Sequence, residues 1–436
     1  MASTFFGLTI AYSGLQAANT SLTITGHNVS NINTKGYTKQ QAGTQAADAL
    51  RTHTTYGAIG SGVVVTEISQ IRDSYYDVKY RNNMANYGQY SVKESYMGQI
   101  EDYLDEFTLN GYSQEYKNFF SAVNQLTITP GDTSAKNQLI NNAKSLADYF
   151  NTLTTNLRNV QADANNEIKD AVQQINSYAK NIAALNRQIN QIEANYGNAN
   201  DLRDKRNAMI DELSEIVNLE TSEEDMGNNI SNFSVRINGQ TLVSSYSYNT
   251  LETVARTDKK NYSDAEGLYD VQWNSGQKFD MYSTSLSGHL KGLIDIRDGN
   301  NGEHENIETD DDGNNVTDSD GNLVLTTAPA ADKTVSYKGV PYYQAQLNEF
   351  AKIFSDAVNK IMKSGYTSDG SSKGISLFVT QPNTTVMSAG NITVNPELLK
   401  NADLLAIKKE QNDGESDAKI MEELNKLQSE KIFAGG

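Results

Sequence analysis

Residues 146–196 read LADYFNTLTTNLRNVQADANNEIKDAVQQINSYAKNIAALNRQINQIEANY, and the spacing of their apolar side chains predicts one long helix. The apolar positions are Leu146, Phe150, Leu153, Leu157, Val160, Ala164, Ile168, Ala171, Ile175, Tyr178, Ile182, Leu185, Ile189, Ile192 and Tyr196. Steps of three and four residues, with one stutter at Ala164 and Ile168, keep a single stripe for packing beside another helix. At ~1.5 Å per residue this is roughly 75 Å of helix, too long for a compact enzyme domain of ordinary size.

Turn signals bound this helix on both sides. Pro130-Gly131-Asp132 predicts a turn before it, and Gly197-Asn198 closes it. A second, shorter helix is predicted to fold back antiparallel. Its apolar positions are Ala199, Leu202, Met209, Leu213 and Ile216. Residues 201–206 alternate in charge, which is typical of a solvated, salt-bridged face, and we assign them no catalytic role.

Composition sets outer limits on the function. The 436 residues suggest about three domains, and the five prolines leave 1–129 and 131–328 free for uninterrupted helices. A net charge of −18 disfavours a nucleic-acid or anionic-membrane footprint. The absence of Cys excludes disulfides, thiolate metal sites and Cys nucleophiles, and fits work outside the cell. No segment approaches the ~20 apolar residues that cross a bilayer.

The first 34 residues contain no charged side chain. A cleavable secretory signal needs a basic start and an unbroken apolar core, and this segment has neither. Its 3-4 spacing predicts a helix with an apolar seam at Phe5, Leu8, Tyr12, Leu15, Asn19, Leu22, Gly26 and Val29. Two interpretations stay open: an ordinary buried helix, or a segment that folds only against copies or partners.

The run GHNVSNINTKGY at residues 26–37 predicts a corner between helix and strand. Its Asn and Ser side chains can bond nearby backbone groups, and Gly36 can adopt a positive φ before the chain becomes extended. The residues of this corner are Asn28, Asn31, Asn33, Gly36 and Tyr37. From GLQA at 14–17 through YTKQ at 37–40, the segment resembles the N-terminal signature of the bacterial flagellar axial proteins, which form rod, hook and hook-associated structures.

Three later stretches narrow the resemblance to the hook-associated protein 1 family. They are NDLRDKRN through DELS at 200–214, followed by FSVRINGQTLV at 233–243, and ITVNPELL at 392–399. The resemblance extends over nearly the whole chain and is weakest across 250–335. A short β excursion over 38–70 and a Tyr-rich helix after Ile71 complete the N-terminal half.

We therefore expect an α+β multidomain fold, a long helical coiled-coil domain with an inserted β-rich outer domain and an N-terminal axial helix. Residues 1–70 are expected to form the axial helix and the corner. Residues 71–220 and 342–436 together are expected to form a discontinuous helical domain, and residues 221–341 the inserted outer domain. In the outer domain, alternating strands with Asn-Gly and Asp-Gly turns replace the helical period. The stripe of Leu347, Phe350, Phe354, Val358 and Ile361 marks the return to helix.

The resemblance implies a structural subunit without enzymatic turnover, joining hook to filament in the bacterial flagellum and serving flagellum assembly and motility. Polymerisation would use coiled-coil packing of terminal helices, with Phe5, Leu8, Tyr12, Leu15, Leu22 and Val29 as the assembly interface. The implied partners are hook protein, the next hook-associated protein and copies of the chain in a ring. The implied location is extracellular, reached by type III export without a cleaved signal.

Family members continue past the point matching KIFAGG at 431–436 and end in a helix that packs on the N-terminal one. No comparable long amphipathic helix is predicted after residue 363. Either the chain is truncated or the terminal pairing is supplied in another way; we expect the first, a chain that lacks that helix and the C-terminal region where an export chaperone acts. Alternatives are another flagellar axial subunit, hook or rod, and a secreted coiled-coil adhesin or effector. A hydrolase with its site in 220–340 would need a carboxylate dyad in a cleft.

Catalytic and metal-binding motifs were sought as well. The four His residues are scattered without ligand spacing, and no motif for a nucleophile, phosphate loop or catalytic zinc occurs, so no cofactor is expected. A weak calcium candidate consists of Asp310, Asp312, Asp318 and Asp320, in a twice-repeated Asp-Gly-Asn pattern. Because an EF-hand alignment fails at its first and last ligand positions, acidic hairpin turns are the default interpretation.

Overall fold

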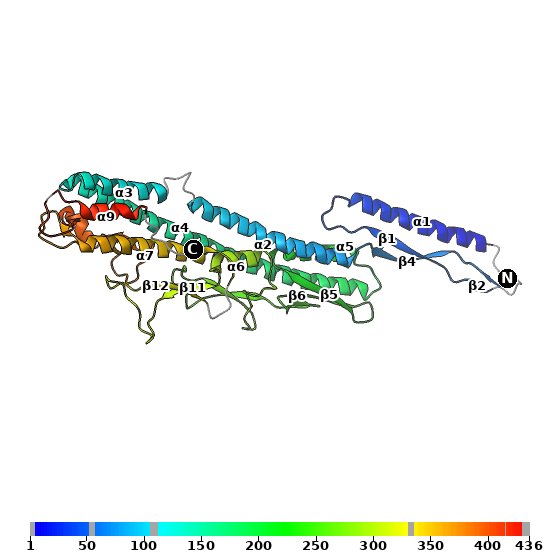
Figure 1. The fold of residues 1–436 in the computed structure, drawn as a ribbon. Coiled ribbons are helices and arrows are strands. Elements are labelled where there is room, and N and C mark those ends of the chain that lie inside the picture. Colours follow the sequence, from blue (N-terminus) through cyan, green and yellow to red (C-terminus); the bar gives the residue numbers. More distant parts are fainter. Residues whose placement is uncertain (1–4, 52–56, 105–111, 330–334, 415, 430–436) are drawn as a thin grey trace. The chain divides into compact units, whose positions relative to one another are not determined.

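The computed structural model describes residues 5–51, 57–104, 112–329, 335–414 and 416–429, and combines long α-helices with small antiparallel sheets (Figure 1). This combination confirms the predicted mixture of helical and β-rich parts, whereas the coiled coil and the inserted domain stay predictions. Contacts divide the chain into two units. Unit 1 is Met1–Ser91, Lys169–Val254 and Val271–Lys291, and unit 2 is Val92–Ile168, Ala255–Asp270 and Gly292–Gly436. The three-part domain layout likewise stays a prediction.

Helix α4 (Thr133–Glu193) is the predicted long helix, extended to 61 residues, or about 92 Å at ~1.5 Å per residue. It begins after the predicted turn, where the Asp132 carboxylate accepts a hydrogen bond from the Ser134 amide at 2.8 Å. This arrangement satisfies one of the amide groups that a helix start leaves unpaired. Most of the predicted apolar stripe is buried, with Leu157, Ile168 and Ile182 all 0% exposed. The prediction was wrong at the end of the stripe: Ile192 is 40% exposed, and Tyr196, 89% exposed, lies beyond the last residue of the helix.

In unit 1, α1 (Phe6–Ser30) lies along an antiparallel hairpin of β1 (Gln40–Ala46) and β4 (Val63–Gln70), as Figure 1 shows. A smaller pair, β2 (Leu50–Arg51) and β3 (Ala58–Ile59), lies within the same excursion. Helix α5 (Asn200–Ile216) is the predicted second helix. These elements confirm the helix, the strand-like excursion and the short helix expected from the sequence.

A four-stranded antiparallel sheet completes unit 1. Its strands are β5 (Leu219–Asp225), β6 (Ser231–Ile237), β7 (Gln240–Ser244) and β8 (Ser247–Tyr248). Asn238 and Gly239, with φ of 47° and 76°, form the predicted Asn-Gly turn between β6 and β7. Asn190 of α4 donates to the Ser231 carbonyl at 2.7 Å and accepts from its amide at 3.1 Å, so the helix pairs directly with strand backbone.

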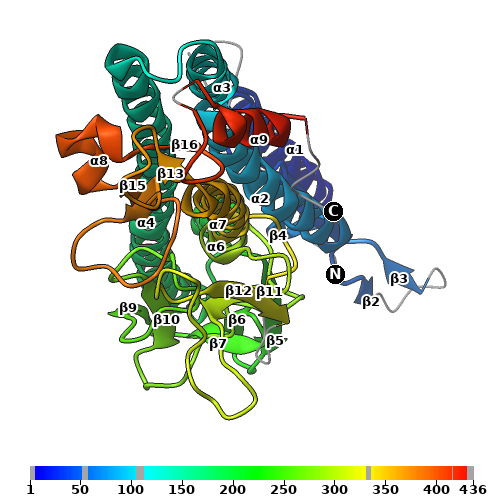
Figure 2. The ribbon, with the colours of Figure 1, turned by 60° about the vertical axis from the view of Figure 1, so that its left-hand side comes forward.

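Unit 2 contains the largest aromatic core. Helices α3 (Tyr112–Ile128) and α9 (Lys419–Leu427) lie side by side (Figures 1 and 2). Helix α7 (Val340–Ser364) buries Phe354 and Val358 of its predicted stripe among Phe119, Phe150 and Phe378. The strand pairs are β11 (Glu303–Ile307) with β12 (Leu325–Pro329), β13 (Tyr366–Thr367) with β16 (Ala406–Lys408), and β14 (Phe378–Thr380) with β15 (Ile392–Val394). A short helix, α8 (Pro396–Lys400), and one 3-10 turn (Ala402–Leu404) follow β15.

The remaining elements are α2 (Ser74–Leu104), α6 (His289–Asp298), β9 (Leu251–Ala255) and β10 (Tyr269–Trp273). Helix α6 lies inside the stretch expected to be β-rich and was missed. Its residues Leu290, Leu293 and Ile294 stand at helical spacing and are 0% exposed, but the helix has only 10 residues, and so short a segment gives a weak periodic signal. Within the described residues, no helix is both long and apolar enough to span a bilayer.

Candidate assembly interface

The predicted apolar seam of α1 is exposed throughout. Its six assembly residues are between 59% and 70% exposed. They are Phe5, Leu8, Tyr12, Leu15, Leu22 and Val29. We call them the α1 stripe. A continuous apolar stripe on a surface helix marks an interaction site more often than scattered apolar residues do.

A different face of α1 packs on the hairpin. It carries the small or polar residues Ser13, Ala17 and Asn28 together with Ile24, and Ala17 and Ile24 are 8% and 7% exposed. The Ser13 hydroxyl accepts a hydrogen bond from the Val63 amide at 3.2 Å. The helix therefore buries its less apolar face inside its own unit, and its more apolar face, the α1 stripe, stays exposed.

Asn28 fixes the corner that ends α1. Its side chain acts like a strand partner for Gln40: the Gln40 amide donates to its Oδ1, and its Nδ2 donates to the Gln40 carbonyl, both at 2.9 Å. The Tyr37 hydroxyl donates to the same Oδ1 at 2.7 Å and lies 3.0 Å from Nδ1 of His27. Asn28 and Tyr37, two residues of the predicted corner, thus share one network.

Of the other predicted corner residues, Asn31 makes hydrogen bonds within the corner, and the side chain of Asn33 makes none to the described residues. Asn31 ends the helix by donating from Nδ2 to the His27 carbonyl at 3.0 Å, and its Oδ1 accepts from the Thr34 hydroxyl at 3.2 Å. Asn33 is exposed, and its side chain has no hydrogen-bond partner among the described residues. The structure thus gives Asn31 a capping role and gives Asn33 none within the chain.

Gly36 lets the corner approach α5. Its φ of 80° favours glycine, and a Cβ there would lie 2.9 Å from the Cβ of Ala208. Immediately after it, the Thr38 amide donates to Oδ2 of Asp204 at 3.0 Å. A larger residue at position 36 would both strain the backbone and separate the corner from α5.

Two further contacts join the corner to the same face of α5. Gln40 donates from Nε2 to Oδ1 of Asp201 at 3.1 Å, and the Lys35 ammonium lies 2.8 Å from Oε1 of Glu212. The hydrogen bond from Lys35 lowers the pKa of Glu212, while the Tyr178 hydroxyl donates to its other oxygen at 3.2 Å. Because Lys35 and Glu212 are exposed to solvent, their ion pair adds little to the free energy of folding. Its main effect is to hold the corner in position against α5.

Asp211 ties the start of α2 to α5. The Arg81 guanidinium donates from Nε to Oδ1 of Asp211 at 2.8 Å and from an end nitrogen to the Thr221 hydroxyl at 3.3 Å. Arg72, which follows β4, lies 3.7 Å from the other Asp211 oxygen and 2.6 Å from Asp77. Because Arg81 is buried, this pair is more sheltered from solvent than the Lys35 pair.

The alternating charges of α5 are not simply a solvated face, and for two residues that interpretation was wrong. Asp204 and Arg206 are only 6% and 2% exposed. The Arg206 guanidinium stacks 3.7 Å from the centre of the Phe233 ring and lies 3.3 Å from Glu223. Burial lowers the pKa of Arg206 to about 10. Arg203, whose side chain is more exposed, pairs with the same Glu223 at 3.0 Å.

The receiving residues on α5 were missed by sequence reasoning. Asp201, Asp204, Ala208 and Glu212 recur at spacings of three and four, which places them on one helix face. That spacing was the available signal. Alternation of sign along the chain concealed it, because neighbours in sequence point to different sides of a helix.

The tyrosines of α2 form a second exposed face in unit 1. Tyr76, Tyr80 and Tyr87 are 67%, 52% and 61% exposed. Tyr suits partly wet helix interfaces because its ring packs while its hydroxyl stays hydrated.

The calcium candidates lie in two separate acidic turns. The Asp310 carboxylate accepts hydrogen bonds from the amides of Asp312 and Asn314 at 3.0 and 2.8 Å. Asp318 does the same with the amides two and four residues later, at 2.8 and 2.9 Å. Each carboxylate therefore closes its own turn.

The fourth candidate, Asp320, is engaged by other groups: it pairs with Lys363 and accepts from the Ser376 hydroxyl at 3.1 Å. In the part of the chain that the structure describes, no group of three or more His, Asp or Glu side chains is placed to hold a metal ion. The structure thus does not gather the four candidates, Asp310, Asp312, Asp318 and Asp320.

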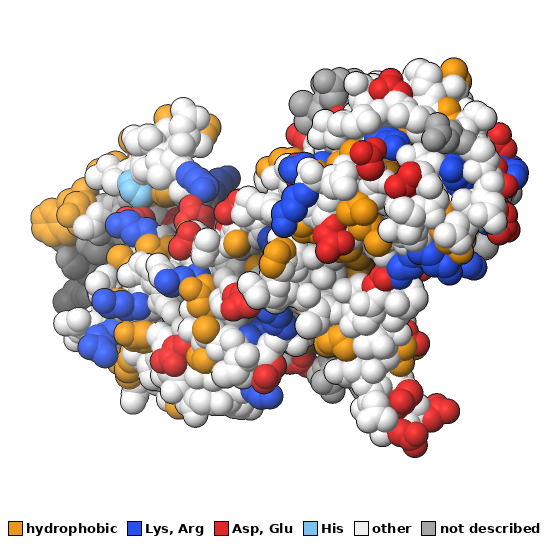
Figure 3. Space-filling view, turned by 90° about the vertical axis from the view of Figure 1, so that its left-hand side faces the viewer, with side chains coloured by type: hydrophobic (Ala, Val, Ile, Leu, Met, Phe, Trp, Pro, Cys, Tyr) orange, Lys and Arg blue, Asp and Glu red, His pale blue; other side chains and the backbone are white. Residues whose placement is uncertain are grey.

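Over most of the face drawn in Figure 3 the surface charge is mixed, while a protruding tip at the lower right carries a cluster of acidic side chains. Elsewhere on this face, Lys and Arg side chains are interspersed with acidic, polar and apolar ones. Against this background, the uncharged α1 stripe is distinctive because a chain of net charge −18 repels its own copies wherever its charges face each other.

Comparisons with known proteins bear on the whole arrangement. The family model described as flagellar hook-associated protein FlgK helical domain matches residues 97–378. Flagellar hook-associated protein 1 of Bacillus subtilis is 32% identical over 234 residues, which is 52% of this chain and 46% of that protein. The same-named protein of Salmonella typhimurium is 33% identical over 219 residues, 50% of this chain and 39% of its own length.

A solved structure shares the fold. The flagellar hook junction protein FlgK from Burkholderia pseudomallei matches with a TM-score of 0.51 and 23% identity, over 69% of this chain and 46% of that one. In each comparison the match spans less than half of the relative's length.

Proposed function

Because the chain belongs to the flagellar hook-associated protein FlgK family, we propose that it is a structural subunit of the bacterial flagellum that joins the hook to the filament. It acts by assembly, without enzymatic turnover. The relatives named flagellar hook-associated protein 1 and the solved hook junction protein support this assignment.

The observation that carries the proposal is the exposed α1 stripe. Six apolar side chains follow one seam of a helix that has no charged residue. Burying such a seam against a neighbouring helix yields roughly 25 cal/mol per Å² of apolar surface, whereas in an isolated chain the same surface stays in water. Polymerisation through terminal helices would supply the missing cover.

The corner gives this seam a direction. Asn28 hydrogen-bonds to the backbone of Gln40 in β1, and the Thr38 amide hydrogen-bonds to Asp204 of α5. Hydrogen bonds fix angles more narrowly than apolar contacts do, since they weaken steeply away from linear geometry. The corner would thereby present the α1 stripe at a set orientation to the next subunit.

The proposed partners are copies of the chain arranged in a ring, hook protein on one side, and the next hook-associated protein on the other. An export chaperone is proposed to act on a C-terminal region of the full-length protein. The proposed route is type III export without a cleaved signal, ending outside the cell at the hook-filament junction.

The test replaces one residue of the stripe in the chromosomal gene. Leu15→Asp places a charge in the seam and should abolish incorporation at the hook tip while leaving the fold of both units intact. Ser21→Asp is the matched control, since Ser21 is exposed on α1 outside the stripe and receives the same charge. Immuno-gold labelling of detached hook-filament structures reads out incorporation.

A motile strain carrying Leu15→Asp, with the variant protein at the hook tip, would overturn the proposal. Equal loss of incorporation in both variants would also count against it, because a general charge effect on α1 would then explain the result.

A further inference from the structure

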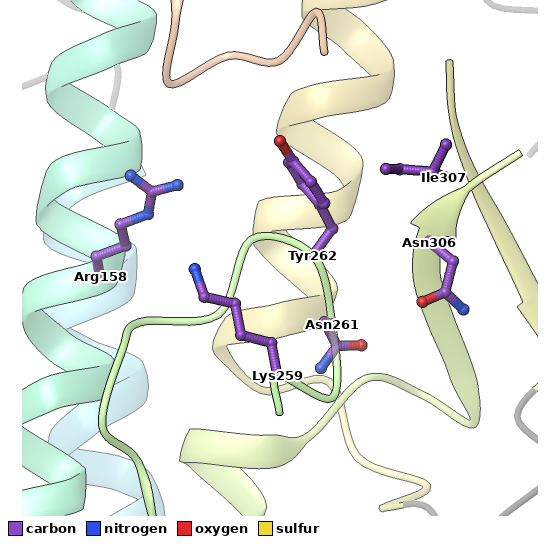
Figure 4. A pocket seen from close by; sticks show the side chains of 6 residues that line it. All are labelled: Arg158, Lys259, Asn261, Tyr262, Asn306 and Ile307. Carbon is purple, nitrogen blue, oxygen red and sulfur yellow. The ribbon is translucent and has the colours of Figure 1, made fainter. Parts of the chain in front are cut away.

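An open cavity of about 520 Å³ lies within unit 2, between α4, the loop that joins β9 to β10, and β11 (Figure 4). Its lining residues are Arg158, Lys259, Asn261, Tyr262, Asn306 and Ile307. Its size falls in the range of pockets that hold small molecules. It is remote in sequence from the α1 stripe and takes no part in the proposed assembly.

The charged side chains that line this cavity are both cations, in a chain of net charge −18. Figure 4 shows Arg158 and Lys259 pointing toward the same opening. Arg158 donates from Nε to the Ser263 carbonyl at 3.4 Å, and its two end nitrogens have no partner among the described residues. Lys259 lies 3.3 Å from Glu266, which is itself 88% exposed.

Neutral groups complete the lining. The Tyr262 hydroxyl and the side-chain amide of Asn306 have no hydrogen-bond partner among the described residues, so both are available to hydrogen-bond to a ligand. A tyrosine hydroxyl is protonated at neutral pH and can donate a hydrogen bond, and burial raises the pKa of Tyr262 further from that range. The Ile307 side chain and the Tyr262 ring supply apolar surface (Figure 4).

Buried hydrogen bonds hold the loop that carries Tyr262. The Tyr262 amide donates to the Glu305 carbonyl at 2.9 Å, and the Ser263 hydroxyl donates to the Glu305 carboxylate at 2.5 Å. Gln161, one turn after Arg158 on α4, donates to the Asp264 carboxylate at 2.9 Å. A loop fixed in advance loses little entropy when a ligand binds, which favours recognition over simple surface adsorption.

We propose that this pocket binds a small carboxylate-bearing ligand, with Arg158 and Lys259 on the carboxylate and Tyr262 and Asn306 on neighbouring hydroxyl or amide groups. Charge-assisted hydrogen bonds from a guanidinium to a carboxylate are roughly twice as strong as neutral ones. The carboxylates of Glu305 and Asp264, which accept hydrogen bonds from Ser263 and Gln161 next to the lining residues, oppose an anion, so we expect weak binding, with a dissociation constant of about 1 mM.

Saturation-transfer NMR on the full chain at fixed ionic strength tests this. Glucuronate is the acidic probe, glucose is its neutral counterpart, and N-acetyl-aspartate carries the carboxylate on an amino acid instead of a sugar. The variants are Arg158→Gln and Tyr262→Phe. Lys180→Gln is the charge-matched control, because Lys180 is exposed on the same helix.

We expect at least one carboxylate probe to bind saturably and glucose not to bind. Arg158→Gln should weaken that binding about tenfold and Tyr262→Phe about threefold, with Lys180→Gln unchanged. Preference for glucuronate or for N-acetyl-aspartate identifies the kind of molecule that carries the carboxylate. Absence of saturable binding by both carboxylates, equal binding of glucose, or equal loss in the Lys180 variant would each overturn the proposal, without touching the proposed junction role.

Discussion

Helices α1 and α4 carry the same apolar spacing and meet opposite fates. Along most of α4 the seam is covered, and Leu157, Ile168 and Ile182 are 0% exposed, although Ile192 near its end is 40% exposed. Along α1 it is open, and Leu8, Leu15 and Leu22 are 67%, 67% and 70% exposed. The comparison shows that spacing defines a surface suited to another helix, whereas the presence of that partner within the chain is a separate fact.

The surroundings of the two helices explain the difference. In unit 2, α4 supplies Leu146 and Phe150 to a core shared with α7, and in unit 1 its Asn190 pairs with β6. The hairpin of β1 and β4 meets α1 on its other face, at Ala17 and Ile24. One helix is thus a structural member of both units, and the other has a free face.

Truncating one leucine on each helix should give the largest contrast. Leu157→Ala leaves a cavity in a packed core and should lower the free energy of unfolding by about 3 kcal/mol. Leu15→Ala should change it by less than about 0.5 kcal/mol, since this side chain is in water. Urea unfolding followed by circular dichroism measures both. A comparable loss for Leu15→Ala would show that the α1 stripe is already covered in the isolated chain.

The corner should give a smaller, local effect. Asn28→Ala removes both hydrogen bonds to the Gln40 backbone and should cost about 1 kcal/mol locally, because the amide and carbonyl of Gln40 lose their partners. Hydrogen exchange at the Gln40 amide should accelerate about fivefold to tenfold. Asn33→Ala is the control and should leave that amide unchanged; matching acceleration in both variants would argue against a specific role for Asn28.

The smallest effect concerns pH. The pKa of Glu212 is lowered from its ordinary value of 4.5 by Lys35, so its contribution to stability is present above that value and is lost as the pH falls through the lowered pKa. Acidification should therefore loosen the contact of the corner with α5, by less than about threefold in exchange rate because the pair is exposed.

Glu212→Gln should remove this pH dependence without affecting the α4 core. An unchanged acid response of corner amides in Glu212→Gln would assign the effect to other carboxylates, with Asp204 as the next one to examine, since it accepts from the Thr38 amide.

Local patterns predicted much of the architecture. The turn at Pro130, the period of α4, the Asn-Gly turn at Asn238 and the stripe of α7 depend on neighbours within a few residues, and all four are present. Helix α6 was not predicted because its 10 residues give too short a periodic signal. The face of α5 that contacts the corner was not predicted because its partners are distant in sequence: Asp204 accepts a hydrogen bond from the amide of Thr38, 166 positions away.

The Arg158 pocket could not be predicted at all. Its walls come from α4, from the loop between β9 and β10, and from β11, and no motif spans the roughly hundred residues that separate Arg158 from Tyr262. The positive charge of this pocket arises only when folding brings Arg158 and Lys259, which are distant in sequence, close together.

By itself, the sequence determined that the long helix α4, the shorter α5 and several turns exist, and which helix faces are apolar, because those properties follow from side-chain spacing and from the backbone preferences of Gly, Pro and Asn. The tertiary structure alone decided which apolar face is covered, which charges of α5 are buried, and where cations gather. Those outcomes depend on surfaces contributed by distant segments, and burial is a property of the pair of surfaces that meet, not of either one.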